Sequence, residues 1–211
     1  MEFKRALQLN PSHLLTRLWY AESLTRRRRY DEAIMESGRA LALDPVSPVS
    51  YNNRGMIFFR ARRYDEAIRA SQQALDLDPS FINALWWQGL SYAGKRDFPK
   101  AIACLTRATA MNDGPFFRAL LGHVYGRAGD RSKALGILDE LTAMATQRFV
   151  SPIDFAVVYA GLGDTDSTFQ WLEKAYQARV VRIHELPSMY FDSLRSDPRY
   201  ADLMRRIGLP L

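Results

Sequence analysis

The sequence Tyr-Asp-Glu-Ala-Ile stands at residues 30–34 and again at residues 64–68, 34 positions later. A weaker copy, Phe-Pro-Lys-Ala-Ile, follows at residues 98–102 after a further 34 positions. Self-similarity at a fixed period of this length is typical of repeat architectures, in which each copy is one supersecondary unit. The spacing therefore indicates a helical repeat array before any single segment is assigned.

A second shared segment follows each copy and ends in Asp-Pro or a related pair. It reads Ala-Leu-Ala-Leu-Asp-Pro at residues 40–45 and Ala-Leu-Asp-Leu-Asp-Pro at residues 74–79, and Ala-Leu-Gln-Leu-Asn-Pro lies one period upstream at residues 6–11. Because proline cannot continue a helix, each segment is expected to close one helix and begin the connection to the next. Downstream the period is 33 residues from Ala101 to Ala134, and then returns to 34.

Small residues recur in the first half of every repeat. They stand at the same offset in five successive copies: Ala21, Gly55, Gly89, Gly122 and Ala156. A small side chain at such a position lets two helix backbones approach closely, so the smallness is a packing requirement. The repeats are thus expected to be pairs of antiparallel helices, each of which needs its neighbours to bury its apolar face.

This period and pattern resemble those of the tetratricopeptide repeat over roughly residues 1–182. The resemblance implies an all-α fold, a right-handed superhelical solenoid of antiparallel helix pairs with a concave groove. The expected organisation is a second helix of a truncated repeat (1–13), five repeats in 14–182 (14–47, 48–81, 82–114, 115–148, 149–182) and a C-terminal extension with a capping helix (183–211). Departures from the repeat pattern at Arg17, Pro152 and Thr168 predict looser terminal repeats.

The chain begins with what the register identifies as a second helix, Glu2 to Gln8, without its first helix. We expect an exposed apolar face there, an origin as part of a longer protein, and a possible homodimer through this half repeat. At the other end, Asp197 with Pro198 predicts the start of a short helix, and Gly208 its stop. That helix is expected to place Tyr200, Leu203, Met204 and Ile207 on one face and to cap the stack.

The C-terminal fifty residues also resemble the repeat region of bacterial multi-domain regulators. The resemblance rests on Tyr-Ala-Gly-Leu-Gly-Asp at residues 159–164, on Trp-Leu-Glu-Lys-Ala-Tyr at residues 171–176 and on the ending after Ser188. In those relatives the repeats follow a winged-helix DNA-binding domain, a nucleotide cyclase domain or a serine/threonine kinase domain. The resemblance implies a regulatory role but does not indicate which effector domain accompanies it.

Composition favours a globular protein without enzymatic chemistry. Hydrophobic residues make up 47% of the chain and charged residues 25%, and the formal net charge is +6. That excess is modest, so nucleic-acid binding stays the less favoured alternative to protein binding, with self-association or an intramolecular ligand as another. No run of apolar residues is long enough for a membrane span, and a single cysteine, Cys104, fits a reducing, cytoplasmic setting.

Catalytic and metal-binding patterns are missing from the sequence. His13, His123 and His184 lie far apart, without a second ligand at helical spacing, and Cys104 stands between Ala103 and Leu105 as a small buried residue would. We therefore expect no enzyme activity, no metal and no cofactor.

The concave groove is the expected functional site, because ligand-facing residues in this family lie on the first helix of each repeat. Aromatic, methionine and arginine side chains there can anchor a peptide or protein partner, and asparagines can bond its backbone. Only one of the neighbours Trp86 and Trp87 can face inward. The chaperone-tail carboxylate clamp of this family is matched only at Asn53. The candidate groove residues are Asn52, Asn53, Met56, Phe59, Arg60, Asn83, Trp86, Trp87, Leu90, Phe116 and His123.

Overall fold

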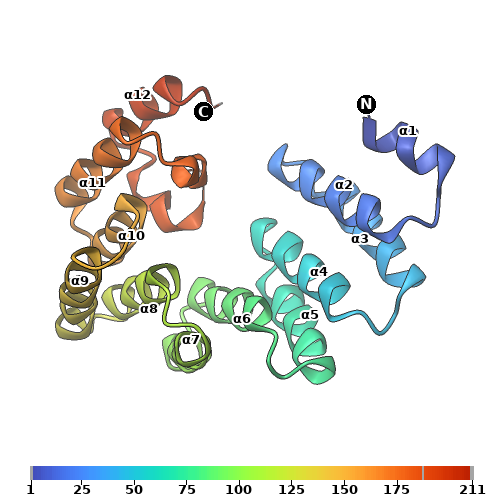
Figure 1. The fold of residues 1–211 in the computed structure, drawn as a ribbon, viewed down its shortest axis with the longest axis horizontal. Coiled ribbons are helices and arrows are strands. Elements are labelled where there is room, and N and C mark those ends of the chain that lie inside the picture. Colours follow the sequence, from blue (N-terminus) through green and yellow to red (C-terminus); the bar gives the residue numbers. More distant parts are fainter. Residues whose placement is uncertain (1, 187, 210–211) are drawn as a thin grey trace. The chain divides into compact units, whose positions relative to one another are not determined.

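The structure is a computed structural model that describes residues 2–186 and 188–209, and throughout these residues it contains helices and no strand (Figure 1). The predicted all-α class is therefore confirmed. The helices are α1 (Glu2–Leu9), α2 (Leu14–Arg26), α3 (Tyr30–Leu43), α4 (Pro48–Arg60), α5 (Tyr64–Leu77), α6 (Ile82–Gly94), α7 (Phe98–Met111), α8 (Pro115–Arg127), α9 (Arg131–Ala145), α10 (Pro152–Leu162), α11 (Thr165–Gln177) and α12 (Pro198–Arg206), with 3₁₀ helices η1 (Val181–Glu185) and η2 (Met189–Leu194).

Consecutive helices form antiparallel pairs, and small residues allow the close contact within each pair. Ala33, Ala67 and Ala101, in the second helices, are completely buried. A Cβ atom added to Gly55 would lie 2.8 Å from the Ser71 hydroxyl oxygen. The recurring alanines and glycines therefore occupy points where one helix touches its partner, as the packing argument predicted.

The turn inside each pair has a repeated backbone conformation. A residue of the turn takes a left-handed φ, as at Arg28 (60°), the middle residue of 27–29, and at Gly129 (87°), the middle residue of 128–130. In the first of these turns the N–H of Arg29 donates to the carbonyl of Leu24, and the N–H of Arg28 donates to that of Thr25. This is a Schellman ending, which satisfies carbonyls that the helix leaves free and reverses the chain in a few residues.

The chain divides into two compact units, an N-terminal unit (Met1–Met111) and a C-terminal unit (Asn112–Leu211). In the N-terminal unit the first helices α2, α4 and α6 pack directly on one another and form one layer, against which α3, α5 and α7 pack (Figure 1). Helix α1 contacts α2, with the Phe3 and Tyr20 ring centroids 5.9 Å apart, but none of its residues is buried. Helix α1 therefore packs on α2 but adds no fully buried side chain to the core.

In the C-terminal unit, α8 and α10 are the first helices and pack on one another, and α12 closes the end. Asp197 caps α12 by accepting a bond from the Arg199 N–H, while Tyr200 and Leu203 are buried. The Arg206 guanidinium pairs with both oxygens of Glu173 on α11, at 2.7 and 2.9 Å. The predicted capping helix is therefore confirmed, with its apolar side facing the core.

Candidate protein-binding face

The first-helix layer of the N-terminal unit carries an exposed apolar patch that the sequence analysis missed. Leu15 and Trp19, one helical turn apart on α2, are 49% and 55% exposed, and Val49 on α4 is 46% exposed. Residues four apart lie on the same side of a helix, so Leu15 and Trp19 present one surface. Tryptophan is usually largely buried, and its exposure here depends on packing that sequence patterns do not report.

Helix α4 places polar groups beside this patch. Asn52 and Asn53 are half-buried, and within the described residues their side-chain oxygens have no hydrogen-bond partner. Buried polar atoms normally find partners, so these two oxygens are exceptions, and they lie beneath the surface, where a ligand does not reach them directly. Arg60, at the end of α4, is exposed, whereas Met56 and Phe59 are buried. Of the candidates on α4, Arg60 is thus at the surface, the two asparagines are half-buried, and the two apolar residues form core.

On α6 the two tryptophans have different environments. Trp87 is 6% exposed and its ring centroid lies 5.2 Å from that of Phe59, which links α6 to α4. Trp86 is half-buried and stacks on Trp87, with centroids 4.1 Å apart. Asn83 is exposed one turn earlier, while Leu90 is buried. The tryptophan pair therefore consists of one core residue and one residue at the surface.

In the C-terminal unit, the chain's own C-terminal extension covers the candidate residues. The Arg182 guanidinium carbon lies 4.5 Å above the centroid of the Phe116 ring, and the same guanidinium forms a 2.5 Å ion pair with the buried Asp154 on α10. Tyr190 of η2 meets the His123 ring edge-on, with centroids 5.6 Å apart. The 3₁₀ helices η1 and η2 thus lie on the first helices that a ligand would otherwise contact.

His123 is held as a neutral core residue. It is 2% exposed, and its Nδ1 lies 2.9 Å from the carbonyl oxygen of Val157. A carbonyl can only accept, so Nδ1 carries the proton and donates it. Burial lowers the pKa of the His123 imidazole to about 4. The side chain therefore contributes to packing between α8, α10 and the C-terminal extension.

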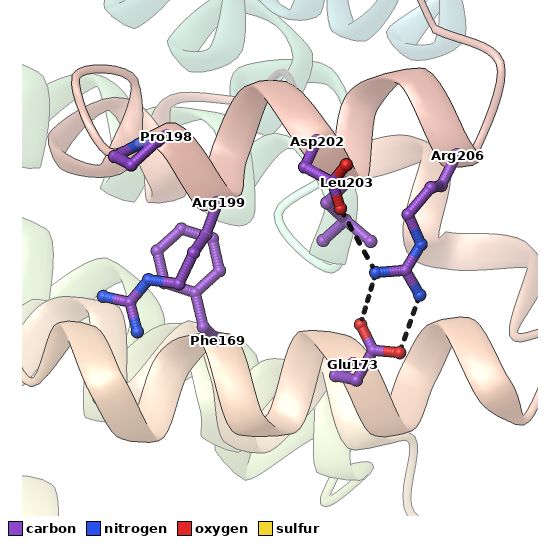
Figure 2. A pocket seen from close by; sticks show the side chains of 7 residues that line it. All are labelled: Phe169, Glu173, Pro198, Arg199, Asp202, Leu203 and Arg206. Atoms are coloured by element: carbon purple, nitrogen blue, oxygen red, sulfur yellow. Dashed lines mark hydrogen bonds and ion pairs between the residues drawn. The ribbon is translucent and has the colours of Figure 1, made fainter.

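A cleft of the C-terminal unit, between α11 and α12, is lined by residues that form internal ion pairs (Figure 2). Arg206 bonds Glu173 and Asp202, and Arg199 lies 4.3 Å from the centroid of the Phe169 ring. These guanidinium groups are already paired, so the cleft offers no free charge for a ligand. Figure 2 shows Arg206 reaching from α12 across to Glu173 on α11, and Arg199 beside the Phe169 ring.

The metal-binding side chains and the single thiol have the following environments in the described residues. Among them no cluster of three histidine, cysteine or carboxylate side chains could hold a metal ion. Burial raises the pKa of the Cys104 thiol to about 11, and the thiol donates to the Gln88 side-chain oxygen at 3.3 Å. A thiol that stays protonated is a poor nucleophile. Also within this part of the chain, no helix combines the length and apolarity needed to cross a bilayer.

Comparison with known proteins agrees with this architecture. Two tetratricopeptide-repeat family models match, one over residues 2–48 and the other over residues 48–81. No curated protein sequence matches the chain.

Similar solved structures include PilW, described as a type IV pilus biogenesis factor (20% identity, TM-score 0.65, covering 91% of this chain and 87% of that one). YrrB, described as a TPR protein with an unusual peptide-binding site, is also 20% identical (TM-score 0.54, 88% and 96% covered). MamA is 23% identical (TM-score 0.58, 68% and 87% covered). Residues 2–81 therefore carry tetratricopeptide repeats, and the chain has the helix-pair fold of tetratricopeptide repeat proteins.

Proposed function

We propose that this protein is an interaction scaffold that binds a peptide or protein partner on the first-helix layer of its N-terminal unit. The exposed apolar patch of Leu15, Trp19 and Val49 carries the proposal. Exposed apolar residues that adjoin one another often mark protein-binding surfaces, and tryptophan is among the commonest anchors in them.

Polar groups of the same layer supply the complementary hydrogen bonds. The exposed Asn83 can donate and accept hydrogen bonds, and the exposed Arg60 adds donors at the end of α4. Trp86 extends the apolar surface along α6. A bound segment would thus be held by an apolar anchor at α2 and by hydrogen bonds at α4 and α6.

The first helices of the C-terminal unit, α8 and α10, are not part of the proposed binding site. Since Arg182 of η1 lies on Phe116 and Tyr190 of η2 lies on His123, an external ligand would have to displace the salt bridge between Arg182 and Asp154. The partner site is therefore assigned to α2, α4 and α6. YrrB, whose fold is similar, is described as binding peptide, which supports a binding role for this fold.

The role of such a scaffold would be regulatory, in a bacterial, cytoplasmic protein that senses or recruits a partner. This part of the proposal rests on the resemblance of residues 159–211 to the repeat regions of bacterial regulators. A homodimer through α1, where Leu9 is 83% exposed, is the competing self-association outcome. Light scattering of the purified protein across a concentration series distinguishes a monomer from such a dimer.

The test is selection from a random peptide library, followed by affinity measurements on the selected peptides. Fluorescence anisotropy with wild-type protein and with Trp19→Ala should show a loss of about tenfold or more, as for an interface hot spot. Phe149→Ala is the matched control, because Phe149 is an exposed aromatic residue (76%) of the C-terminal unit. Equal affinity of the wild type and the Trp19 variant would refute the proposed site.

Intrinsic fluorescence gives an independent readout of the same site. Emission from a half-exposed tryptophan should shift to shorter wavelength when a ligand excludes water from it. A shift that disappears in Trp19→Ala and persists in Phe149→Ala supports binding at α2. If the selected peptides bind but leave the tryptophan emission unchanged, the binding site does not include Trp19.

A further inference from the structure

The C-terminal extension turns back over the first helices of its own unit. Helix α11 ends in a turn at residues 178–180, whose middle residue, Arg179, has a left-handed φ of 51°. The N–H of Val180 donates to the carbonyl of Ala175 at 3.0 Å, which makes this turn a Schellman ending that reverses the chain. Beyond it, η2 packs on α10. The extension therefore lies on the helix pairs and does not form another pair.

Asp154 on α10 is the charged exception at its position in the repeat. In the four preceding first helices the same position is occupied by Trp19, Asn53, Trp87 and Leu120. Asp154 is 2% exposed, and burial of a carboxylate is costly unless a cation pairs with it. Arg182, which forms an ion pair with it, belongs to η1 and so to the extension. The helix pairs thus carry a buried negative charge that a side chain from outside them neutralises.

Phe116 and Asp154 together form what we call the guanidinium socket. The Arg182 guanidinium carbon lies 4.5 Å above the centroid of the Phe116 ring, while the same group bonds the Asp154 carboxylate at 2.5 Å. A planar guanidinium can stack on a ring and donate to a carboxylate at the same time, whereas a lysine ammonium is a compact point charge. The socket therefore has the chemistry to select arginine. It is reached from the surface, since the Arg182 side chain is 28% exposed.

A second anchor of the extension lies on His123 of α8. Tyr190 of η2 is buried and meets the neutral His123 ring edge-on, with centroids 5.6 Å apart. Arginine and tyrosine are among the residues that most often anchor one protein segment on another. The extension thus contacts α8 and α10 through an arginine in a charged socket and an aromatic ring further along. This is the manner in which a bound segment contacts a protein surface.

We propose that α8 and α10 form a second ligand site, for an arginine-bearing segment of a partner protein, and that η1 and η2 occupy it as an internal ligand. The buried Asp154 carboxylate is the complementary charge that such a segment needs. Because the extension is tethered to the site, its effective concentration there is high, and it competes strongly with an external segment. The contact is therefore autoinhibitory. This site is separate from the apolar patch at Trp19 and does not depend on it.

The test supplies the extension's own sequence as a separate molecule. The probe is a fluorescent peptide with the sequence of residues 180–194, titrated into full-length protein and followed by anisotropy. Arg182→Ala removes the internal arginine from the socket, so this variant should bind the peptide about tenfold or more tightly than wild type. The same peptide with lysine in place of its arginine should bind this variant about tenfold more weakly, because lysine cannot stack and pair as arginine does.

Further substitutions in the Arg182→Ala background locate the peptide. Asp154→Asn removes the charge of the socket with little change in shape, and peptide affinity should fall to that of wild type. Asp166→Asn is the matched control, because Asp166 is an exposed carboxylate of the same unit, and it should leave the affinity unchanged, as should Trp19→Ala. The proposal is overturned if Arg182→Ala shows no saturable binding, or if the lysine peptide or the Asp154→Asn variant binds as tightly.

Hydrogen exchange of the wild-type protein gives a second test that needs no variant. An internal ligand opens separately from the site that holds it, whereas a part of the core opens only together with its surroundings. Amides of η1 and η2 should therefore exchange about tenfold or more faster than those of α8 and α10. Exchange of all four helices at one common rate would identify the extension as core and overturn the proposal.

Discussion

Substitution of Gly161 by alanine should destabilise the C-terminal unit, although alanine is the better helix former. A Cβ atom at Gly161 would lie 2.4 Å from the carbonyl oxygen of His123 and 2.6 Å from its Cα. Gly126 meets α10 in the same way, because its added Cβ would lie 2.6 Å from the carbonyl carbon of Gly161. The backbones of α8 and α10 are therefore in direct contact at this point.

Two opposing effects determine the size of the change. Replacing glycine by alanine inside a helix gains about 1 kcal/mol from propensity. Inserting a methyl group into a packed site costs roughly 1–3 kcal/mol, with larger values when the obstructing atoms cannot move. At Gly161 those atoms belong to the backbone of α8, so a whole helix must shift. We expect a net loss of about 2 kcal/mol in the free energy of unfolding.

Gly136 provides the matched control in the same unit. It lies within α9, and a Cβ atom there would have nothing within 4 Å. Gly136→Ala should therefore stabilise the protein by about 0.5–1 kcal/mol. Urea titrations followed by far-ultraviolet circular dichroism would measure both variants. An increase in the midpoint for both Gly136→Ala and Gly161→Ala would refute the inferred contact between α8 and α10.

Three further predictions concern buried side chains. Because the pKa of His123 is lowered to about 4 from an ordinary value of 6.5, its contribution to stability is complete above pH 6.5 and is lost as the pH falls towards 4. The full loss is about 3 kcal/mol, and denaturant titrations at several pH values should show a flatter profile for His123→Gln. Arg182→Ala leaves the buried Asp154 carboxylate without this ion pair, so it should cost about 2 kcal/mol and make residues 181–194 more sensitive to limited proteolysis. Trp87→Ala should lower the free energy of unfolding by about 3–5 kcal/mol. Trp86→Ala should lower it distinctly less, because only the Trp87 side chain is core, and thermal melts of the two variants measure the difference.

The repeat pattern predicted the helix pairs because its signals are local and redundant. Ala33, Ala67 and Ala101 are completely buried, as their periodic smallness indicated. The capping helix followed from Asp197 and Pro198, whose helix-starting geometry depends on neighbouring residues alone. Such features recur at nearly every period, so a weak copy at residues 98–102 does not obscure them.

The candidate groove was harder to predict, because it depends on which side of each helix remains uncovered. Sequence periodicity placed Trp86 and Trp87 on a first helix without choosing between them, and the contact of Trp87 with Phe59 made the choice. Trp19 was missed for the same reason. Its exposure reflects the space around α2, which no residue near it in the sequence encodes.

Local patterns in the chain were enough to predict that this protein consists of paired helices, where the pairs turn, and that a short helix begins at Pro198. These properties follow from spacing, small residues and helix-terminating residues, which act over a few positions of the chain. Long-range packing, by contrast, places Arg182 on Phe116 and Tyr190 on His123, and leaves Trp19 exposed. Those contacts join residues distant in sequence, and they form only where packing brings the helices and the C-terminal extension together.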